Sequence, residues 1–127
     1  MSNGLGILGL AYKAGKLAFG DTAVHAAVRN KRARLICAAT DAGERTKQHA
    51  ADMPNRCNAL FVQTLFTREE LGRALGFEQC SIAAFTDAGF AWSFARALAQ
   101  VDAAQYAALE QELAVRHKRT QTRRSRK

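Results

Sequence analysis

The sequence predicts an α/β fold, a three-layer α/β/α sandwich around a small mixed sheet. Short apolar runs alternate with segments in which apolar residues recur at helical spacing, as in chains that alternate strands and helices. The run LICAA at residues 35–39 is apolar throughout and too short for a buried helix, which is typical of a strand covered on both faces. With 127 residues, the chain is long enough to bury a core within one domain.

The first third of the chain predicts a helix, an edge strand and a second helix. Apolar residues at helical spacing predict a helix over residues 4–14, and a short edge strand follows over residues 17–19. Gly20 gives the backbone freedom for a turn. The side-chain oxygen of Asp21 or Thr22 is then placed to cap a helix that starts at this turn.

Two capping boxes are predicted in the middle of the chain. Asp41 with Glu44 stands at the start of a helix that follows the central strand. Thr67 with Glu70 stands at the start of the helix that Gly76 stops. Each pair would satisfy backbone N–H groups that a helix leaves without partners in its first turn.

The remaining elements are two strands, a buried helix and a basic tail. Strands are predicted over residues 59–63 and 81–85, and a helix with a buried face follows the second. We divide the chain into a folded domain (1–101), a helical extension (102–115) and a tail (116–127). The tail lacks the apolar residues needed to order it, so we expect it to be disordered when alone.

The positive charge lies at the two ends of the sequence. The formal net charge is +8. Residues 1–34 carry a formal charge of +5, residues 35–115 carry −4 and the tail carries +7. Such a layout attracts a polyanion, for which RNA or DNA is the commonest candidate. The alternative is a solvated surface with a solubilising tail.

The sequence carries no sign of a membrane protein, a secreted protein or a metalloprotein. It has no apolar run of the ~20 residues that a membrane helix needs, and its first residues lack a basic signal-peptide region. We expect a cytoplasmic location. Cys37, Cys57 and Cys80 are widely spaced without a CxxC pair, which favours reduced core thiols over a metal site. No cofactor is expected.

No catalytic motif stands out either. The string GLGILG at residues 4–9 matches a dinucleotide fingerprint, but no strand can precede it. Asp41 and Asp87 each follow a strand in the same string, TDAG. They are either paired carboxylates or helix caps, and capping is the favoured interpretation.

Four strings together resemble a known family: GKLAFGDTAV, RARLICAATDAG, TREELGRALG and IAAFTDAGFA. The chain looks like a member of the kink-turn-binding ribosomal protein superfamily, which includes L-seven-Ae and L-thirty-e, and most like its bacterial YlxQ-like branch. The resemblance covers residues 4–101. It implies an α/β/α sandwich without catalysis that binds kinked RNA through the N-terminus of its second helix and a neighbouring loop.

Several residues correspond to the family's RNA-binding positions. The resemblance places the family's lysine at Lys16 after Gly15, its turn glycine at Gly20 and its second RNA-contacting loop at residues 76–81. This loop contains Phe77, which either stacks on an unpaired base or caps the core. We predict contacts with RNA in the domain from Lys13, Lys16, Gly20, Asp21, Thr22 and Phe77, and in the tail from Arg116, Lys118, Arg119, Arg123 and Arg124.

The chain departs from the family where the kink is read. Kink-turn binders carry Asn, then Glu or Gln, and then Lys three residues on, whereas this chain has Thr22, Ala23 and Ala26. The groups that read guanine edges are therefore missing. The basic residues from Arg29 to Arg34 lie at the far end of the same predicted helix, where a second phosphate contact is possible.

Three hypotheses remain open from the sequence. The first is a monomeric RNA-binding protein related to ribosomal proteins, with rRNA or another structured RNA as its partner. The second is a protein-interaction module of the same fold that has lost its RNA site and docks on a ribosome or a transcription complex. The third is the accessory domain of an RNA methyltransferase, which needs a longer chain.

Overall fold

The computed structural model describes residues 4–125, and its element order confirms an α/β fold with a mixed sheet. The elements are α1 (Leu5–Lys13), β1 (Leu17–Phe19), α2 (Gly20–Arg29), β2 (Leu35–Ala38), α3 (Glu44–Asp52), the 3-10 helix η1 (Met53–Arg56), β3 (Leu60–Gln63), α4 (Arg68–Leu75), β4 (Ile82–Phe85), α5 (Ala88–Val101) and α6 (Ala103–Ser125).

The four strands form one sheet in the order β1-β4-β2-β3. Strand β4 pairs antiparallel with both β1 and β2, and β2 pairs parallel with β3. All residues of the two inner strands are buried, as the continuous apolar run predicts. Phe19 and Ala38 lie toward one end of the sheet, the α4 end, while Leu17 and Leu35 lie toward the other, which we call the Arg34 end.

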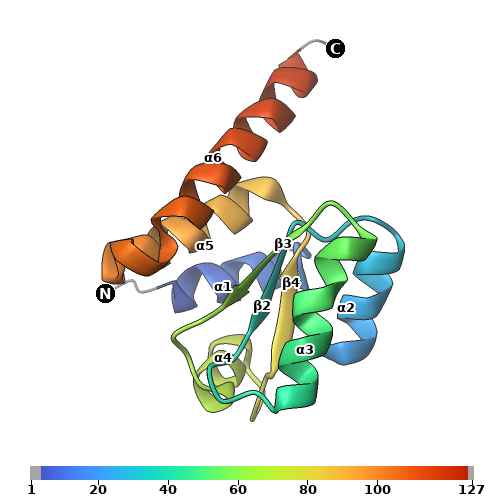
Figure 1. The fold of residues 1–127 in the computed structure, drawn as a ribbon, viewed down its shortest axis with the longest axis vertical. Coiled ribbons are helices and arrows are strands. Elements are labelled where there is room, and N and C mark those ends of the chain that lie inside the picture. Colours follow the sequence, from blue (N-terminus) through green and yellow to red (C-terminus); the bar gives the residue numbers. More distant parts are fainter. Residues whose placement is uncertain (1–3, 126–127) are drawn as a thin grey trace.

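Helices cover both faces of the sheet and make the three predicted layers (Figure 1). Alternate strand residues point to opposite faces, so the sheet separates two apolar clusters. Ile36 and Ile82 pack with α2 and α3 on one face. Leu35 and Phe85 pack with α1, α4, α5 and α6 on the other.

Helix α6 extends the molecule beyond this sandwich. It packs against α5 and runs along β3, where the Tyr106 hydroxyl donates to the Gln63 carbonyl at 3.1 Å. Ten residues later, Arg116 Nη1 donates to the Asn58 carbonyl at 2.9 Å. The last turns of the helix project away from the rest of the molecule (Figure 1).

The tail (116–127) is expected to be disordered, but residues 116–125 continue α6 in the structure. Residues 126–127 lie outside the described residues. Two contacts with distant parts of the chain hold α6 where this segment begins. Arg116 bonds to Asn58, and the ring of His117 stacks on Trp92 with centroids 5.4 Å apart. Both contacts join the helix to parts of the chain that are far away in sequence.

Two of the four predicted caps are wrong. Helix α2 has no side-chain cap from Asp21 or Thr22, and α3 begins after Gly43 without a cap from Asp41. The Asp41 carboxylate instead accepts from the Arg68 backbone N–H at 2.7 Å, because the chain places the start of α4 beside it.

The other two predicted caps are confirmed. Thr67 and Glu70 form a full capping box at α4. The Asp87 carboxylate accepts from the Phe90 N–H at 3.0 Å at the start of α5. Asp41 and Asp87 follow antiparallel strands and therefore lie at opposite ends of the sheet, so they are not paired carboxylates.

Two of the three cysteines are buried, as core thiols would be. Burial raises the pKa of Cys80 to about 11 and raises that of Cys37 as well. Within residues 4–125, no helix combines the length and apolar character that crossing a membrane requires.

Candidate nucleic-acid interface

No side chain caps the backbone N–H groups at the start of α2. Gly20, its first residue, has φ of +87°, a conformation that L side chains rarely adopt. Asp21, Thr22 and Ala23 follow with exposed side chains. Because the first N–H groups of a helix have no intrahelical partners and carry the positive end of its dipole, this turn can accept an anion.

An aromatic cluster lies directly beside this turn. Phe77 stacks on Phe19, the residue before Gly20, with ring centroids 4.4 Å apart and an interplanar angle of 13°. Tyr12 meets both rings edge-on, at 6.3 Å from Phe19 and 5.9 Å from Phe77. Phe77 is 44% exposed, so it is not a core residue, and part of its ring is open to a ligand.

Helix α4 holds the Phe77 loop in place. The Phe77 N–H donates to the Gly72 carbonyl at 2.8 Å, and the Cys80 N–H donates to the Arg68 carbonyl at 2.9 Å. A Cβ added at Gly72 would lie 2.6 Å from the backbone of Gln79. The loop therefore approaches α4 so closely that only glycine fits at this position.

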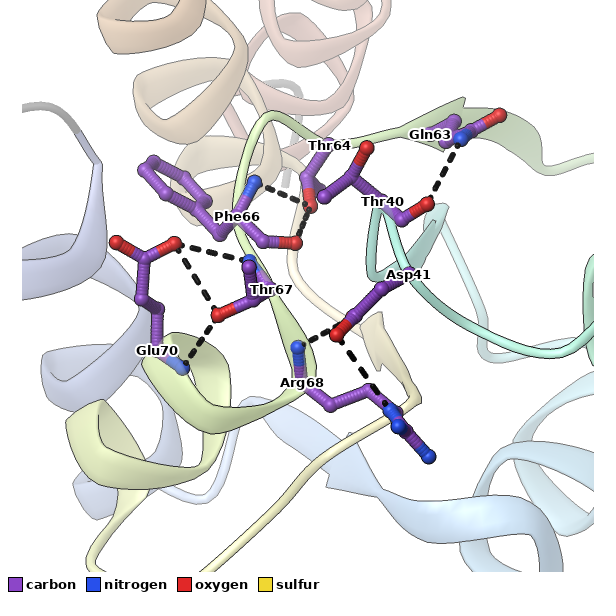
Figure 2. A network of polar contacts seen from close by, with 8 residues as sticks. All are labelled: Thr40, Asp41, Gln63, Thr64, Phe66, Thr67, Arg68 and Glu70. Carbon is purple, nitrogen blue, oxygen red and sulfur yellow. Dashed lines mark hydrogen bonds and ion pairs between the residues drawn. The ribbon is translucent and has the colours of Figure 1, made fainter.

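A polar network fixes the start of α4 in turn (Figure 2). The Thr67 N–H donates to Glu70 Oε1 at 2.9 Å, and the Glu70 N–H donates to Thr67 Oγ1 at 3.1 Å. Asp41, after β2, binds the Arg68 N–H and lies 3.7 Å from its Nε. Thus β2 positions α4, and α4 positions Phe77 beside the start of α2.

Of the two predicted lysines, Lys16 lies at the other end of β1, whereas Lys13 lines a cavity with Glu70 and Arg73 of α4. Lys13 ends α1 and Lys16 precedes β1, and both side chains are exposed. The Lys16 carbonyl accepts from the Thr86 N–H at 2.9 Å, which places its backbone at the Arg34 end. At about 3.3 Å per residue, Lys16 and Gly20 are ~13 Å apart along the strand. The predicted site thus follows the edge strand β1, from Lys16 to Gly20.

The surface at the α4 end is not strongly basic. A cavity of about 660 Å³ beside Phe77 is lined by Arg68 and Arg73. It is also lined by the carboxylates of Asp41, Glu69 and Glu78. With two arginines and three carboxylates, this lining has a formal charge of 2 − 3 = −1.

Positive charge gathers instead at the Arg34 end. The exposed residues Arg29, Lys31, Arg32 and Arg34 follow one another from the end of α2 to β2. Arg116 and Arg119 of α6 share a cavity with Arg34, a meeting that the sequence does not signal. Lys118 is exposed on the same helix, and the side chains of Arg123 and Arg124 lie outside the described residues.

The described residues do not assemble a metal site. No group of three or more His, Cys, Asp or Glu residues in the described structure can hold a metal ion. The rings of His25 and His49 meet edge-on with centroids 6.3 Å apart, a contact between α2 and α3 on the face away from Phe77.

No protein-family model matches the chain, but individual proteins do. An RNA-binding protein YlxQ from Bacillus subtilis (strain 168) is 37% identical over 87 residues, which are 67% of this chain and 84% of that protein. An RNA-binding protein YlxQ from Enterococcus faecium is 31% identical over 87 residues, which are 68% of this chain and 82% of that protein.

Two solved structures are similar as well. A protein of unknown function from Bacillus halodurans has a TM-score of 0.68 and 32% identity, and the match covers 74% of this chain and 94% of that one. A 15.5kD RNA-binding protein from Giardia lamblia has a TM-score of 0.59, with 80% of this chain and 86% of that one covered. Its 18% identity supports the shared fold alone. From the identity and coverage of its curated relatives, the chain belongs to the YlxQ family.

Proposed function

We propose that this protein binds structured RNA and catalyses no reaction. The observation that carries the proposal is the uncapped start of α2, which lies beside the exposed aromatic ring of Phe77. Two relatives in the same family, 37% and 31% identical, are named RNA-binding proteins. The proposed partner is rRNA or another structured RNA in the cytoplasm, at the ribosome or the transcription machinery.

The two features of this site suit an RNA bend. The backbone N–H groups at Gly20 to Thr22 would bind a phosphate, as helix N-termini do. An unpaired base would stack on Phe77 or Tyr12, because proteins read RNA mainly where bases are unstacked. Lys16, before the edge strand, and Lys13, at the end of α1, would contact further phosphates, as would the basic residues of α6.

We propose that recognition relies on the shape of the RNA rather than on base edges. Thr22 and the exposed Ala23 offer neither the amide nor the carboxylate needed to read guanine edges. Ala26, one turn along α2, offers no positive charge. A bent RNA with an unstacked base would still present a phosphate to α2 and a base to Phe77.

Binding to a kinked RNA and to an unkinked duplex of equal length tests the proposal. We expect the full chain to prefer the kinked RNA. Thr22→Glu places a negative charge at the proposed phosphate position and should lower the affinity about tenfold, whereas Thr22→Gln should stay within about threefold of the parent. No measurable binding of either RNA at low salt would refute RNA binding itself.

The second candidate is a protein-interaction module of the same fold. The nearly balanced charges beside Phe77 and the 60% exposed side chain of Leu10 favour it. Nuclease treatment distinguishes the two functions. Partners that stay bound after nuclease would support the interaction module, and their complete loss would support RNA binding.

A further inference from the structure

Three arginines and no carboxylate line a cavity at the Arg34 end of the sheet. The cavity measures about 220 Å³ and is lined by Arg34, Arg116 and Arg119 together with Asn58, Thr120 and two apolar side chains. A water molecule takes up ~30 Å³ in the liquid, so the cavity has room for a phosphodiester group and several waters. Such a concentration of cations without a lining acid is suited to an anion.

Three distant parts of the sequence build this cavity. Arg34 precedes β2, and its backbone is fixed on both sides. Its N–H donates to the Phe85 carbonyl at 2.7 Å, and its carbonyl accepts from the Leu60 N–H at 3.0 Å. On α6, Arg119 and Thr120 lie three and four residues after Arg116, so the three side chains share one face of that helix. The helix passes this end of the sheet in Figure 1.

The three arginines differ in how much of their hydrogen-bonding capacity the protein uses. Arg116 is engaged by the protein, because its Nε pairs with Glu112 at 2.9 Å and its Nη1 binds the Asn58 carbonyl. Arg34 and Arg119 form no ion pair with any described side chain. Arg116 thus holds α6 against the sandwich, and the other two guanidinium groups remain available for a ligand.

Two acids neighbour lining residues in the chain, and among the described side chains only one of them, Glu112, pairs with a cation. Glu112 pairs with Arg116, and Asp87 at the start of α5 accepts from the Phe90 N–H. The loop that leads into Arg34 adds Arg29, Lys31 and Arg32, and Lys118 neighbours Arg119 in sequence, all of them exposed. The surroundings therefore reinforce the positive field of the cavity.

From this geometry we propose that the Arg34–Arg116–Arg119 cavity binds a backbone phosphate of the RNA as a second site, at the opposite end of the sheet from the start of α2. The proposal rests on the proposed function and adds a defined contact to it. Planar guanidinium groups bind phosphate oxygens in a bidentate manner, and two of the three here have their donors available. The bound RNA, or two segments of it, would then contact both ends of the sheet.

The experiment compares two double variants of the full chain that lose the same charge. Arg34→Gln/Arg119→Gln removes the two available cations of the cavity. The matched control, Arg45→Gln/Lys47→Gln, removes two cations of α3 that do not line the cavity. Arg116 is left unchanged because it anchors α6, and circular dichroism of each variant checks that α6 still forms.

RNA affinity is measured as a function of salt for the parent and both variants. We expect the cavity variant to lose about tenfold in affinity at low salt and to flatten the slope of log Kobs against log[salt] by about 1–2. The control should lose less than about threefold. If both variants lose the same amount, the effect is general electrostatics and the cavity is not a site.

Other outcomes separate this proposal from the proposed function. If the parent binds RNA and the cavity variant binds equally well, the cavity proposal fails while RNA binding stands. If the parent binds no RNA, the proposed function fails, and the cavity proposal falls with it. Arg119→Lys provides a further check. The lysine keeps the positive charge but cannot make a bidentate contact, so we expect the RNA affinity to fall, but by less than in Arg119→Gln.

Discussion

Gly72 is the residue on which the position of Phe77 depends. It lies in the middle of α4, where glycine is unfavourable for the helix itself. The compensation is the close approach of the Gln79 backbone, which a Cβ would meet at 2.6 Å. Because that atom belongs to the backbone of the loop, a larger residue would have to move the loop and with it Phe77.

Gly72→Ala should therefore destabilise the protein, by about 1–3 kcal/mol, as overpacking does. Gly6→Ala is the matched control, since Gly6 is also helical and a Cβ there meets nothing within 4 Å. We expect the control to be neutral or stabilising by up to ~1 kcal/mol. Urea unfolding of both variants measures the difference, and equal effects would contradict the close approach of the loop.

Residue identity alone does not determine what a side chain does. The string TDAG occurs twice, and Asp87 caps α5 as predicted while Asp41 binds the start of α4 instead. The prediction for Asp87 depends on residues three positions apart. The role of Asp41 depends on Arg68, which lies 27 residues away, and no local pattern contains that partner.

At the scale of the element, the start of α4 and the start of α2 are built in opposite ways. Helix α4 has a complete capping box, whereas α2 has no side-chain cap. A capped start is held by its own side chains and has fewer N–H groups to offer. An uncapped start keeps them for a ligand. Helices α1 and α3 also start without a side-chain cap, so what singles out α2 is the exposed ring of Phe77 beside its start.

Alanine substitutions test this contrast. Thr67→Ala should lower the free energy of unfolding by about 1 kcal/mol, because it removes the acceptor for the Glu70 N–H. Thr22→Ala should change it by less than ~0.5 kcal/mol, because Thr22 caps nothing. Thermal or urea unfolding measures both, and a large loss in Thr22→Ala would show that α2 does have a cap in solution.

The length of helix α6 could be predicted only in part from its own residues. Spacing of apolar residues predicts that helix resumes through Leu113, and the structure contains that segment. The continuation past Arg116 depends on Asn58, 58 residues earlier in the chain. From its composition, a basic segment with few apolar residues is expected to be disordered. The contact with Asn58 cannot be predicted from composition.

For the whole molecule, the sequence predicts that a polyanion binds but not on which side. The strand and helix pattern predicts three layers and a mixed sheet, and both are observed. The charge blocks are visible in the sequence as well. Their meeting in space is not, because Arg34 and Arg119 come together only through the course of α6 along β3, which Tyr106 and Arg116 fix.

The resulting arrangement has two distinct proposed contacts with RNA. The start of α2 offers N–H groups and an aromatic ring at one end of the sheet, while the arginine cavity offers charge at the other. The contacts share no residue and are separated by the length of the strands, ~13 Å for four residues. Substitutions at two such separated sites are expected to act independently.

Combining Thr22→Glu with Arg34→Gln/Arg119→Gln tests this independence. If each change lowers the affinity about tenfold, or ~1.4 kcal/mol, the combined variant should lose about a hundredfold, with the two free energies adding within ~0.5 kcal/mol. Binding of the kinked RNA by all four proteins in the cycle, at one salt concentration, gives the result. If the combined variant binds the kinked RNA as tightly as whichever separate variant binds it less tightly, both changes disrupt a single contact. The proposal of two separate RNA contacts would then be wrong.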